Sequence, residues 1–113
     1  MSGGTPVIEE ITAEQLKHRM YAKVAPTVID VRERGELDIG RLDFARIIPY
    51  SQLANHLEEL DPASPVVVVC RSGNRSFQAC KLLVSHGFRA VSHVTGGLLA
   101  WAERVDPTMR PYT

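Results

Sequence analysis

Hydrophobic runs alternate with polar turns along this chain and divide it into short strands and amphipathic helices. Runs rich in β-branched residues, such as the four valines at 66–69, predict buried strands. Segments with helical spacing of apolar residues, many of them closed by glycine or proline, predict helices. The expected strands are residues 7–10, 27–31, 47–48, 66–69 and 88–94, and the expected helices are residues 13–22, 33–39, 52–60, 76–86 and 98–105.

The order of these segments is strand followed by helix, repeated from one end to the other. This order predicts an α/β fold with a mainly parallel sheet of about five strands and helices on both faces. The 113 residues contain no internal repeat, low-complexity tract or linker. We therefore expect a single domain that spans residues 1–113.

Composition narrows the possible functions. Thirteen acidic and thirteen basic residues give no net charge, which argues against nucleic-acid or membrane-surface binding driven by bulk charge. No apolar stretch is long enough to span a membrane, and the first residues lack the features of a signal peptide. Two cysteines do not form a secreted disulfide framework, so a reducing cytoplasm is the expected location.

The junction V-V-V-V-C-R-S-G-N-R-S is the most informative point in the chain. Cys70 ends the valine strand, and the polar loop after it leads to a helix expected from Ser76. Ligands of open α/β sheets bind at such strand ends, and a helix N-terminus favours an anion there. We therefore expect Cys70 to be a reachable, nucleophilic thiolate at the mouth of a ring of backbone N–H groups.

The loop residues strengthen this interpretation. Two arginines add local positive charge, and a glycine lets the backbone turn its amides inward around an anion. The alternative, an inert thiol buried at the end of an apolar strand, stays open on residue chemistry alone. The candidate substrate-binding residues are Arg71, Ser72, Gly73, Asn74, Arg75 and Ser76.

Four segments in the expected order resemble the rhodanese family of single-domain sulfurtransferases. The segment D-V-R-E-R-G-E at 30–36, the Ile48-Pro49 pair, the loop at 70–76 and the G-G-x-x-A-W pattern at 96–101 each resemble a family motif. Between Gly40 and Pro49 the chain departs from the family pattern, with Arg41 in place of a histidine. Arg41 is interpreted as a solvated surface residue, with an anion-attracting rim as the alternative.

The resemblance implies a reaction. Cys70 takes a sulfane sulfur from a small sulfur-containing anion, such as thiosulfate or a polysulfide, and holds it as a persulfide. A thiol, cyanide or protein acceptor then removes that sulfur. Neither a metal nor an organic cofactor is implied, and no separate general base is required. Arg71 and Arg75 are expected to hold the anionic donor, since guanidinium groups suit oxyanions.

Two other functions compete with this one. The chain ending, W-A-E-R-V-D-P-T-M-R-P-Y, is similar to rhodanese modules attached to sulfur-carrier-activating enzymes, which favours a sulfur-relay or regulatory module with a protein partner. Related phosphatases and arsenate reductases have a longer loop, with arginine six residues after the cysteine. Here Ser76 holds that place, so phosphoryl chemistry is disfavoured.

Several residues outside the loop have competing interpretations. Asp30 and Arg32 end a neighbouring strand and either support the loop or form a local ion pair. Cys80 lies on an apolar helical stripe and is expected to pack in the core, with a resolving-thiol role as the alternative. The four histidines show no metal-ligand spacing, so no metal site is expected, and each is interpreted as a surface or helix-end residue.

Overall fold

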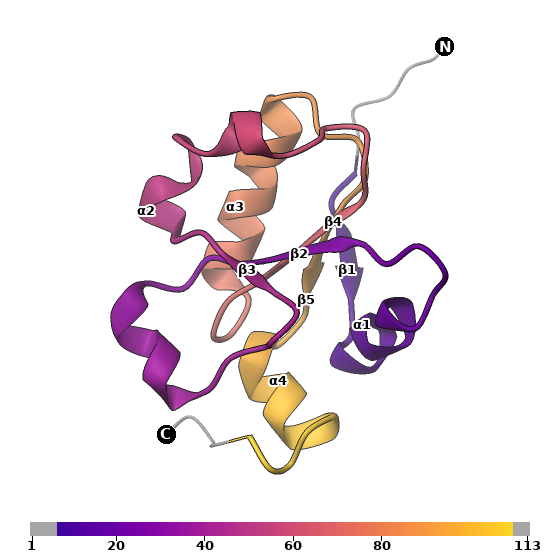
Figure 1. Ribbon diagram of the computed structural model, residues 1–113, viewed down its shortest axis with the longest axis vertical. Coiled ribbons are helices and arrows are strands. Elements are labelled where there is room, and N and C mark those ends of the chain that lie inside the picture. Colours follow the sequence, from indigo (N-terminus) through magenta and orange to yellow (C-terminus); the bar gives the residue numbers. More distant parts are fainter. Residues whose placement is uncertain (1–6, 110–113) are drawn as a thin grey trace.

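The computed structural model describes residues 7–109 and contains one sheet with helices on both of its faces (Figure 1). Residues 110–112, the last of the family-like ending, lie outside the described part. In chain order the elements are β1 (Glu9–Ile11), α1 (Ala13–Met20), β2 (Thr27–Asp30), a 3₁₀ helix (Arg34–Ile39), β3 (Arg46–Ile47), α2 (Tyr50–Leu53), a second 3₁₀ helix (Leu57–Glu59), β4 (Val66–Val69), α3 (Asn74–Ser85), β5 (Val91–Val94) and α4 (Gly97–Arg104).

All strand pairs in the sheet are parallel, and the spatial order is β1-β5-β4-β2-β3. The expected α/β fold with a five-stranded parallel sheet is therefore confirmed. The valine strand β4 lies at the centre, between β2 and β5. Because parallel strands end at one edge, the residues that follow β2 and β4 meet there.

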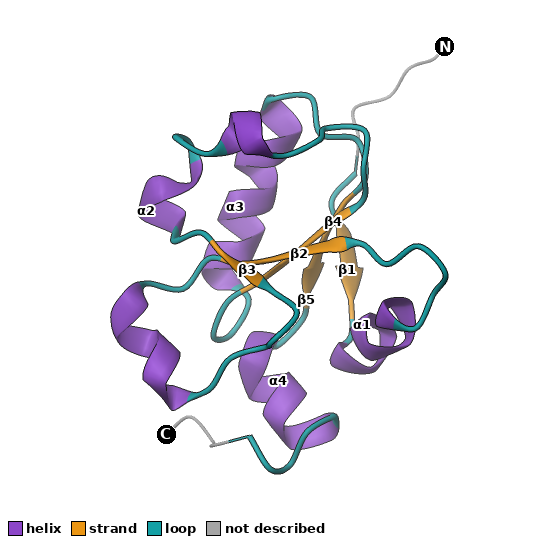
Figure 2. Ribbon diagram, viewed as in Figure 1, coloured by secondary structure: helices purple, strands orange, loops and turns teal. Residues whose placement is uncertain are grey.

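Alternate valines of β4 face opposite layers, which explains why the strand is apolar throughout. Val66 and Val68 belong to the core beneath α2 and α3, whereas Val67 and Val69 belong to the core beneath α1 and α4. Figure 2 shows these two helix pairs on opposite sides of the strands. A strand covered on both faces has no solvent side, so it needs no polar alternation.

Helix α3 begins at Asn74, two residues earlier than the sequence predicted. Gly73 precedes it with a φ of 114°, in the left-handed region that favours glycine, and this turn lets the helix start at once. The early start brings Asn74, Arg75 and Ser76 into the first helical turn. Their backbone N–H groups are the ones that a helix leaves without internal partners.

Other predicted boundaries were wrong where local contacts compete with the pattern. The expected helix 52–60 is split into α2 and a 3₁₀ turn, and Ser51 lies inside α2, where its hydroxyl donates to Glu33. The expected strand 88–94 shortens to Val91–Val94 because the N–H of Phe88 donates to the Leu83 carbonyl and closes α3. The first strand is Glu9–Ile11 rather than 7–10.

Candidate active site

Cys70 lies immediately after β4, and its side chain points to the layer of α3. It shares that core cluster with Val66 and Val68, as the alternation along the strand requires. The residue is only 1% exposed, so the expectation of a reachable sulfur is wrong for this conformation. A donor can therefore reach the sulfur only after the residues that cover it move.

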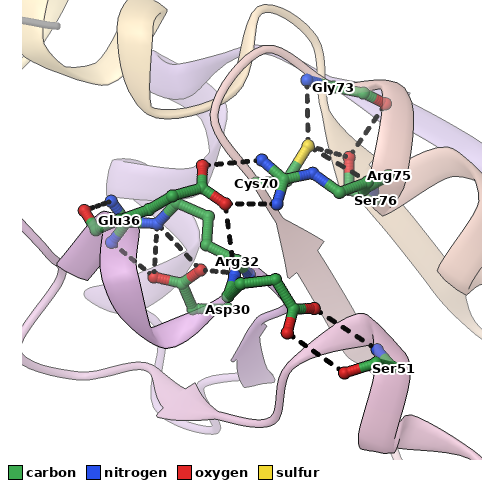
Figure 3. Close-up of polar contacts among 9 residues, drawn as sticks. Asp30, Arg32, Glu36, Ser51, Cys70, Gly73, Arg75 and Ser76 are labelled. Carbon is green, nitrogen blue, oxygen red and sulfur yellow. Dashed lines mark hydrogen bonds and ion pairs between the residues drawn. The ribbon is translucent and has the colours of Figure 1, made fainter.

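Two backbone amides point at the sulfur (Figure 3). The N–H of Gly73 donates to Cys70 Sγ at 3.1 Å, and the N–H of Ser76 donates to it at 3.3 Å. The Cys70 thiol in turn lies 3.5 Å from the hydroxyl oxygen of Ser76. Amides aimed at one buried atom favour negative charge on it, since they replace water as hydrogen-bond donors.

Helix α4 holds the same loop from the outside. The N–H of Leu98 donates to the Cys70 carbonyl at 2.9 Å, and the N–H of Leu99 donates to the Arg71 carbonyl at 3.1 Å. This approach is possible because Gly97 has no side chain, since a Cβ there would lie 2.4 Å from the Cys70 carbonyl oxygen. With two carbonyls bound by α4, the loop is held in the conformation that turns its amides toward the sulfur.

Arg75 is occupied by a carboxylate. Its guanidinium forms a two-pronged ion pair with Glu36, in which Nη2 donates to Oε2 at 2.8 Å and Nη1 contacts Oε1 (Figure 3). The hydrogen bond from Arg75 lowers the pKa of Glu36, and the same contact raises the pKa of Arg75. In this conformation Arg75 therefore ties the loop to the 3₁₀ helix, although the sequence suggested that it holds a donor anion.

Asp30 and Arg32 form a second, fully buried ion pair at the end of β2. The Arg32 Nη2 donates to Asp30 Oδ2 at 2.7 Å, and the Arg32 backbone N–H donates to Oδ1 at 3.0 Å. The Arg32 Nη1 also donates to the Glu36 carbonyl at 3.3 Å. The pair is thus local, yet it reaches the loop indirectly, because Glu36 binds Arg75.

The rest of the loop faces outward. Ser72 and Asn74 are exposed and Arg71 is half-buried, while Gly73 and Ser76 are buried beneath them. The loop thus has an inner side of amides on the sulfur and an outer side of polar side chains. Such a loop resembles an anion cradle in which the thiol itself occupies the anion position.

Comparisons with known proteins identify this arrangement. A family model described as "Rhodanese-like domain" matches residues 12–104. The chain belongs to the rhodanese-like domain family. It is 31% identical over 105 residues to a protein named "Sulfurtransferase" from Allochromatium vinosum, covering 93% of this chain and 98% of that one.

Two further relatives extend the comparison. The rhodanese-like chain is 44% identical over 92 residues to "Adenylyltransferase and sulfurtransferase UBA4" of Yarrowia lipolytica, covering 76% of this chain but 23% of that longer protein. A crystal structure of a rhodanese-related protein from Thermoplasma volcanium has a TM-score of 0.76 at 33% identity, covering 86% of this chain and 93% of that one.

Cys80 of this rhodanese-like domain lies in the core, as expected. It is a free thiol with no exposed surface, and its Sγ donates to the Ser92 carbonyl at 3.5 Å. Burial, and to a lesser degree the neighbouring Cys70, raises the pKa of Cys80 to about 12. Its surroundings keep the thiol protonated, which disfavours a resolving role.

His93 was missed by the sequence analysis. The expectation of a surface or helix-end residue is wrong, because His93 lies within β5 and is 5% exposed. Strand β5 pairs with both β1 and β4, so its residues have sheet neighbours on either side. The available signal was its position in the expected strand 88–94 of an α/β fold, since an inner strand buries both of its faces.

Within residues 7–109, no group of three or more His, Cys, Asp and Glu side chains gathers in a way that could hold a metal ion. No helix in the same range is long and apolar enough to cross a membrane.

Proposed function

We propose that this rhodanese-like domain is a sulfurtransferase that moves a sulfane sulfur from thiosulfate or a polysulfide to a thiophilic acceptor through a persulfide on Cys70. The observation that supports this most directly is the pair of amides from Gly73 and Ser76 on Cys70 Sγ, at 3.1 and 3.3 Å. They favour the thiolate, which is the nucleophilic form of cysteine.

In the first half of the reaction, the Cys70 thiolate attacks the outer sulfur of thiosulfate. A new S–S bond forms to Cys70, the original S–S bond breaks, and sulfite leaves with the electron pair. The two loop amides spread the negative charge before the attack and on the terminal persulfide sulfur afterwards. Atoms and charge balance without a cofactor.

In the second half, cyanide or a thiolate attacks the terminal sulfur of the persulfide. The bond between the two sulfurs of the persulfide breaks, and Cys70 leaves again as a thiolate stabilised by the same amides. A reducing cytoplasm is the proposed setting, because the cycle begins and ends with a free Cys70 thiol.

The loop side chains divide into two roles in this proposal. Arg71, Ser72 and Asn74 are the proposed contacts for the anionic donor, because they lie on the outer side of the loop. Arg75 and the Asp30–Arg32 pair are proposed to hold the loop in place through Glu36. An ion-paired Arg75 still adds positive charge beside the sulfur, which suits a negatively charged donor.

The test is intact-protein mass spectrometry after incubation with thiosulfate and, separately, a polysulfide. We expect the wild type and Cys80→Ser to gain the mass of one sulfur atom and to lose it again when cyanide is added. Cys70→Ser should gain nothing. Absence of a sulfur adduct on Cys70 with both donors, in a folded protein, would remove the basis of the proposal.

A protein acceptor is the second candidate, favoured by the 44% identity to the Yarrowia lipolytica sulfurtransferase. In this version the domain passes its sulfur to a thiolate on a partner protein, which attacks the terminal sulfur of the persulfide, and small acceptors are poor substitutes. Discharge of the Cys70 persulfide is then slow with cyanide and fast with a protein acceptor. Equally fast discharge by cyanide and glutathione would favour a general enzyme with small-molecule acceptors.

A further inference from the structure

A chain of polar contacts leads away from Cys70 through Ser76 and His93 to Glu10. The Cys70 thiol lies 3.5 Å from Ser76 Oγ, and this oxygen lies 3.4 Å from Nδ1 of His93. On the far side of the ring, His93 Nε2 lies 3.5 Å from the Glu10 carboxylate. The chain therefore links the loop, α3, β5 and β1.

The charge of Glu10 decides which nitrogen of His93 carries the hydrogen. Nε2 is buried and makes no hydrogen bond, and a carboxylate oxygen 3.5 Å away favours an N–H at this position over a lone pair. With the hydrogen on Nε2, Nδ1 presents a lone pair to Ser76. A carboxylate, an imidazole and a hydroxyl then follow one another toward the nucleophile, as in nucleophile–base constellations.

The hydroxyl of Ser76 can serve both neighbours. In this conformation it donates to the Gly73 carbonyl at 3.0 Å, while its oxygen lies within reach of both the Cys70 sulfur and His93. Rotation about the Cβ–Oγ bond moves the hydrogen from Gly73 to Nδ1 without moving the oxygen. Ser76 has no exposed surface, so bulk water does not compete for these contacts.

We propose that Ser76 and His93 carry the proton away from the Cys70 thiol, with His93 as the general base that produces the nucleophilic thiolate. The S–H bond of Cys70 breaks and its proton goes to Ser76 Oγ, while the Ser76 hydroxyl proton goes to His93 Nδ1. The products are a thiolate held by loop amides and an imidazolium whose Nε2–H faces Glu10. Charge is conserved, and no oxidant or reductant takes part.

The surroundings of His93 let the proton exchange with solvent. A cavity of about 520 Å³ opens beside it, lined by Glu10, Arg75 and Phe77 among others. The charged groups around the ring are Glu10 from β1 and, from α3, Arg75 and Lys81, whose Nζ lies 5.4 Å from the centre of the Phe77 ring. Phe77 packs against His93 with 5.4 Å between ring centroids, which fixes the imidazole plane.

This inference deepens the proposed function, but thiolate formation can be measured without any sulfur transfer. The experiment follows the rate of alkylation of Cys70 by iodoacetamide between pH 5 and pH 9, with peptide mapping to separate Cys70 from Cys80. The full chain is compared with Ser76→Ala and His93→Asn. Asparagine keeps a hydrogen-bonding group toward Ser76 but cannot hold the proton, so it separates a base from a structural residue.

We expect the wild-type profile to contain a step that both variants lack, and the rate at neutral pH to fall roughly 10- to 100-fold in His93→Asn. If His93→Asn keeps the wild-type rate and profile, the proton path is wrong. Glu10→Gln is a second test variant, and it does not disturb the core because the Glu10 side chain is 67% exposed. Loss of this carboxylate removes the group that favours the hydrogen on Nε2, so the alkylation rate at neutral pH should fall, and an unchanged rate would also overturn the assignment.

The outcome is separable from that of the proposed function. If the wild type shows the alkylation step but takes no sulfur from thiosulfate or polysulfide, the proton path stands and the proposed sulfurtransferase activity is wrong. If His93→Asn loads sulfur as fast as the wild type, the sulfurtransferase activity stands and the proton path is wrong.

Discussion

Cys70 and Cys80 lie in the same core cluster and are almost equally buried, yet their polar neighbours are opposite in kind. The sulfur of Cys70 receives two backbone N–H groups, whereas the sulfur of Cys80 faces the carbonyl oxygen of Ser92. Donors stabilise a thiolate and an acceptor stabilises a thiol. Two thiols with nearly the same burial thus face opposite hydrogen-bonding partners, and we expect this difference to appear in their reactivity.

The largest expected effect is a difference in native-state alkylation between the two thiols. Because the pKa of Cys80 is raised to about 12, this thiol stays protonated near pH 8 and is also shielded by the core. We expect iodoacetamide to modify Cys70 at least about 100-fold faster than Cys80 in the folded protein. Peptide mapping after timed quenching measures both rates.

Unfolding provides the control for this prediction. In urea the two cysteines lose their different surroundings and should react at similar rates. Fast alkylation of Cys80 in the folded protein would contradict the contrast between the two cysteines. It would mean that a reactive thiolate forms where the sulfur faces a carbonyl oxygen.

An intermediate effect is expected from Gly97→Ala, which disturbs the loop around Cys70 and leaves Cys80 untouched. The new Cβ would lie 2.4 Å from the Cys70 carbonyl oxygen and 2.5 Å from that of Arg71, so α4 must move away from the loop. We expect this variant to lose about 1–3 kcal/mol more free energy of unfolding than a matched glycine variant. Urea denaturation measures the stability, and mass spectrometry measures sulfur loading.

The matched control is Gly87→Ala. Gly87 also has a positive φ, of 91°, but a Cβ there would meet no atom within 4 Å. It therefore carries the conformational strain without the clash. Equal destabilisation of the two variants, with normal sulfur loading in Gly97→Ala, would show that close docking of α4 is not what holds the loop.

The smallest effect is expected from Glu36→Gln, which removes the ion pair between Arg75 of the Cys70 loop and the 3₁₀ helix. The hydrogen bond from Arg75 lowers the pKa of Glu36 from 4.5, so the unfolded chain binds this proton more readily than the folded one. The stabilisation is present above pH 4.5 and is lost as the pH falls through the folded-state pKa. We expect a difference of about 1 kcal/mol or less between the wild type and the variant at neutral pH.

Denaturation curves at neutral pH and at about pH 3 test this prediction, since the difference between the two proteins should shrink in acid. Glu14→Gln is the control, because its partner Arg104 lies 3.5 Å away and both side chains are more than half exposed. If the wild type and Glu36→Gln differ by the same free energy of unfolding at both pH values, the role assigned to the ion pair is wrong.

Elements whose signals lie within a few residues were predictable from the sequence. Helix α1 begins at Ala13, as expected, behind a capping box formed by Thr12 and Gln15, and the valine run became the central strand. The boundaries of helices and strands were less predictable where a residue could either continue a strand or close a helix. Phe88 reads as a strand residue, but its N–H closes α3 by binding the Leu83 carbonyl.

The order of strands and helices and the place of Cys70 at a strand end follow from the amino-acid sequence, because both depend on neighbouring residues along the chain. The tertiary fold is needed to bring Arg75 to Glu36, 39 positions away, and His93 to Ser76, 17 positions away. The fold also brings the amides of α4 to the loop carbonyls. Partners at such separations are selected by packing of the whole sheet, and no local pattern records them.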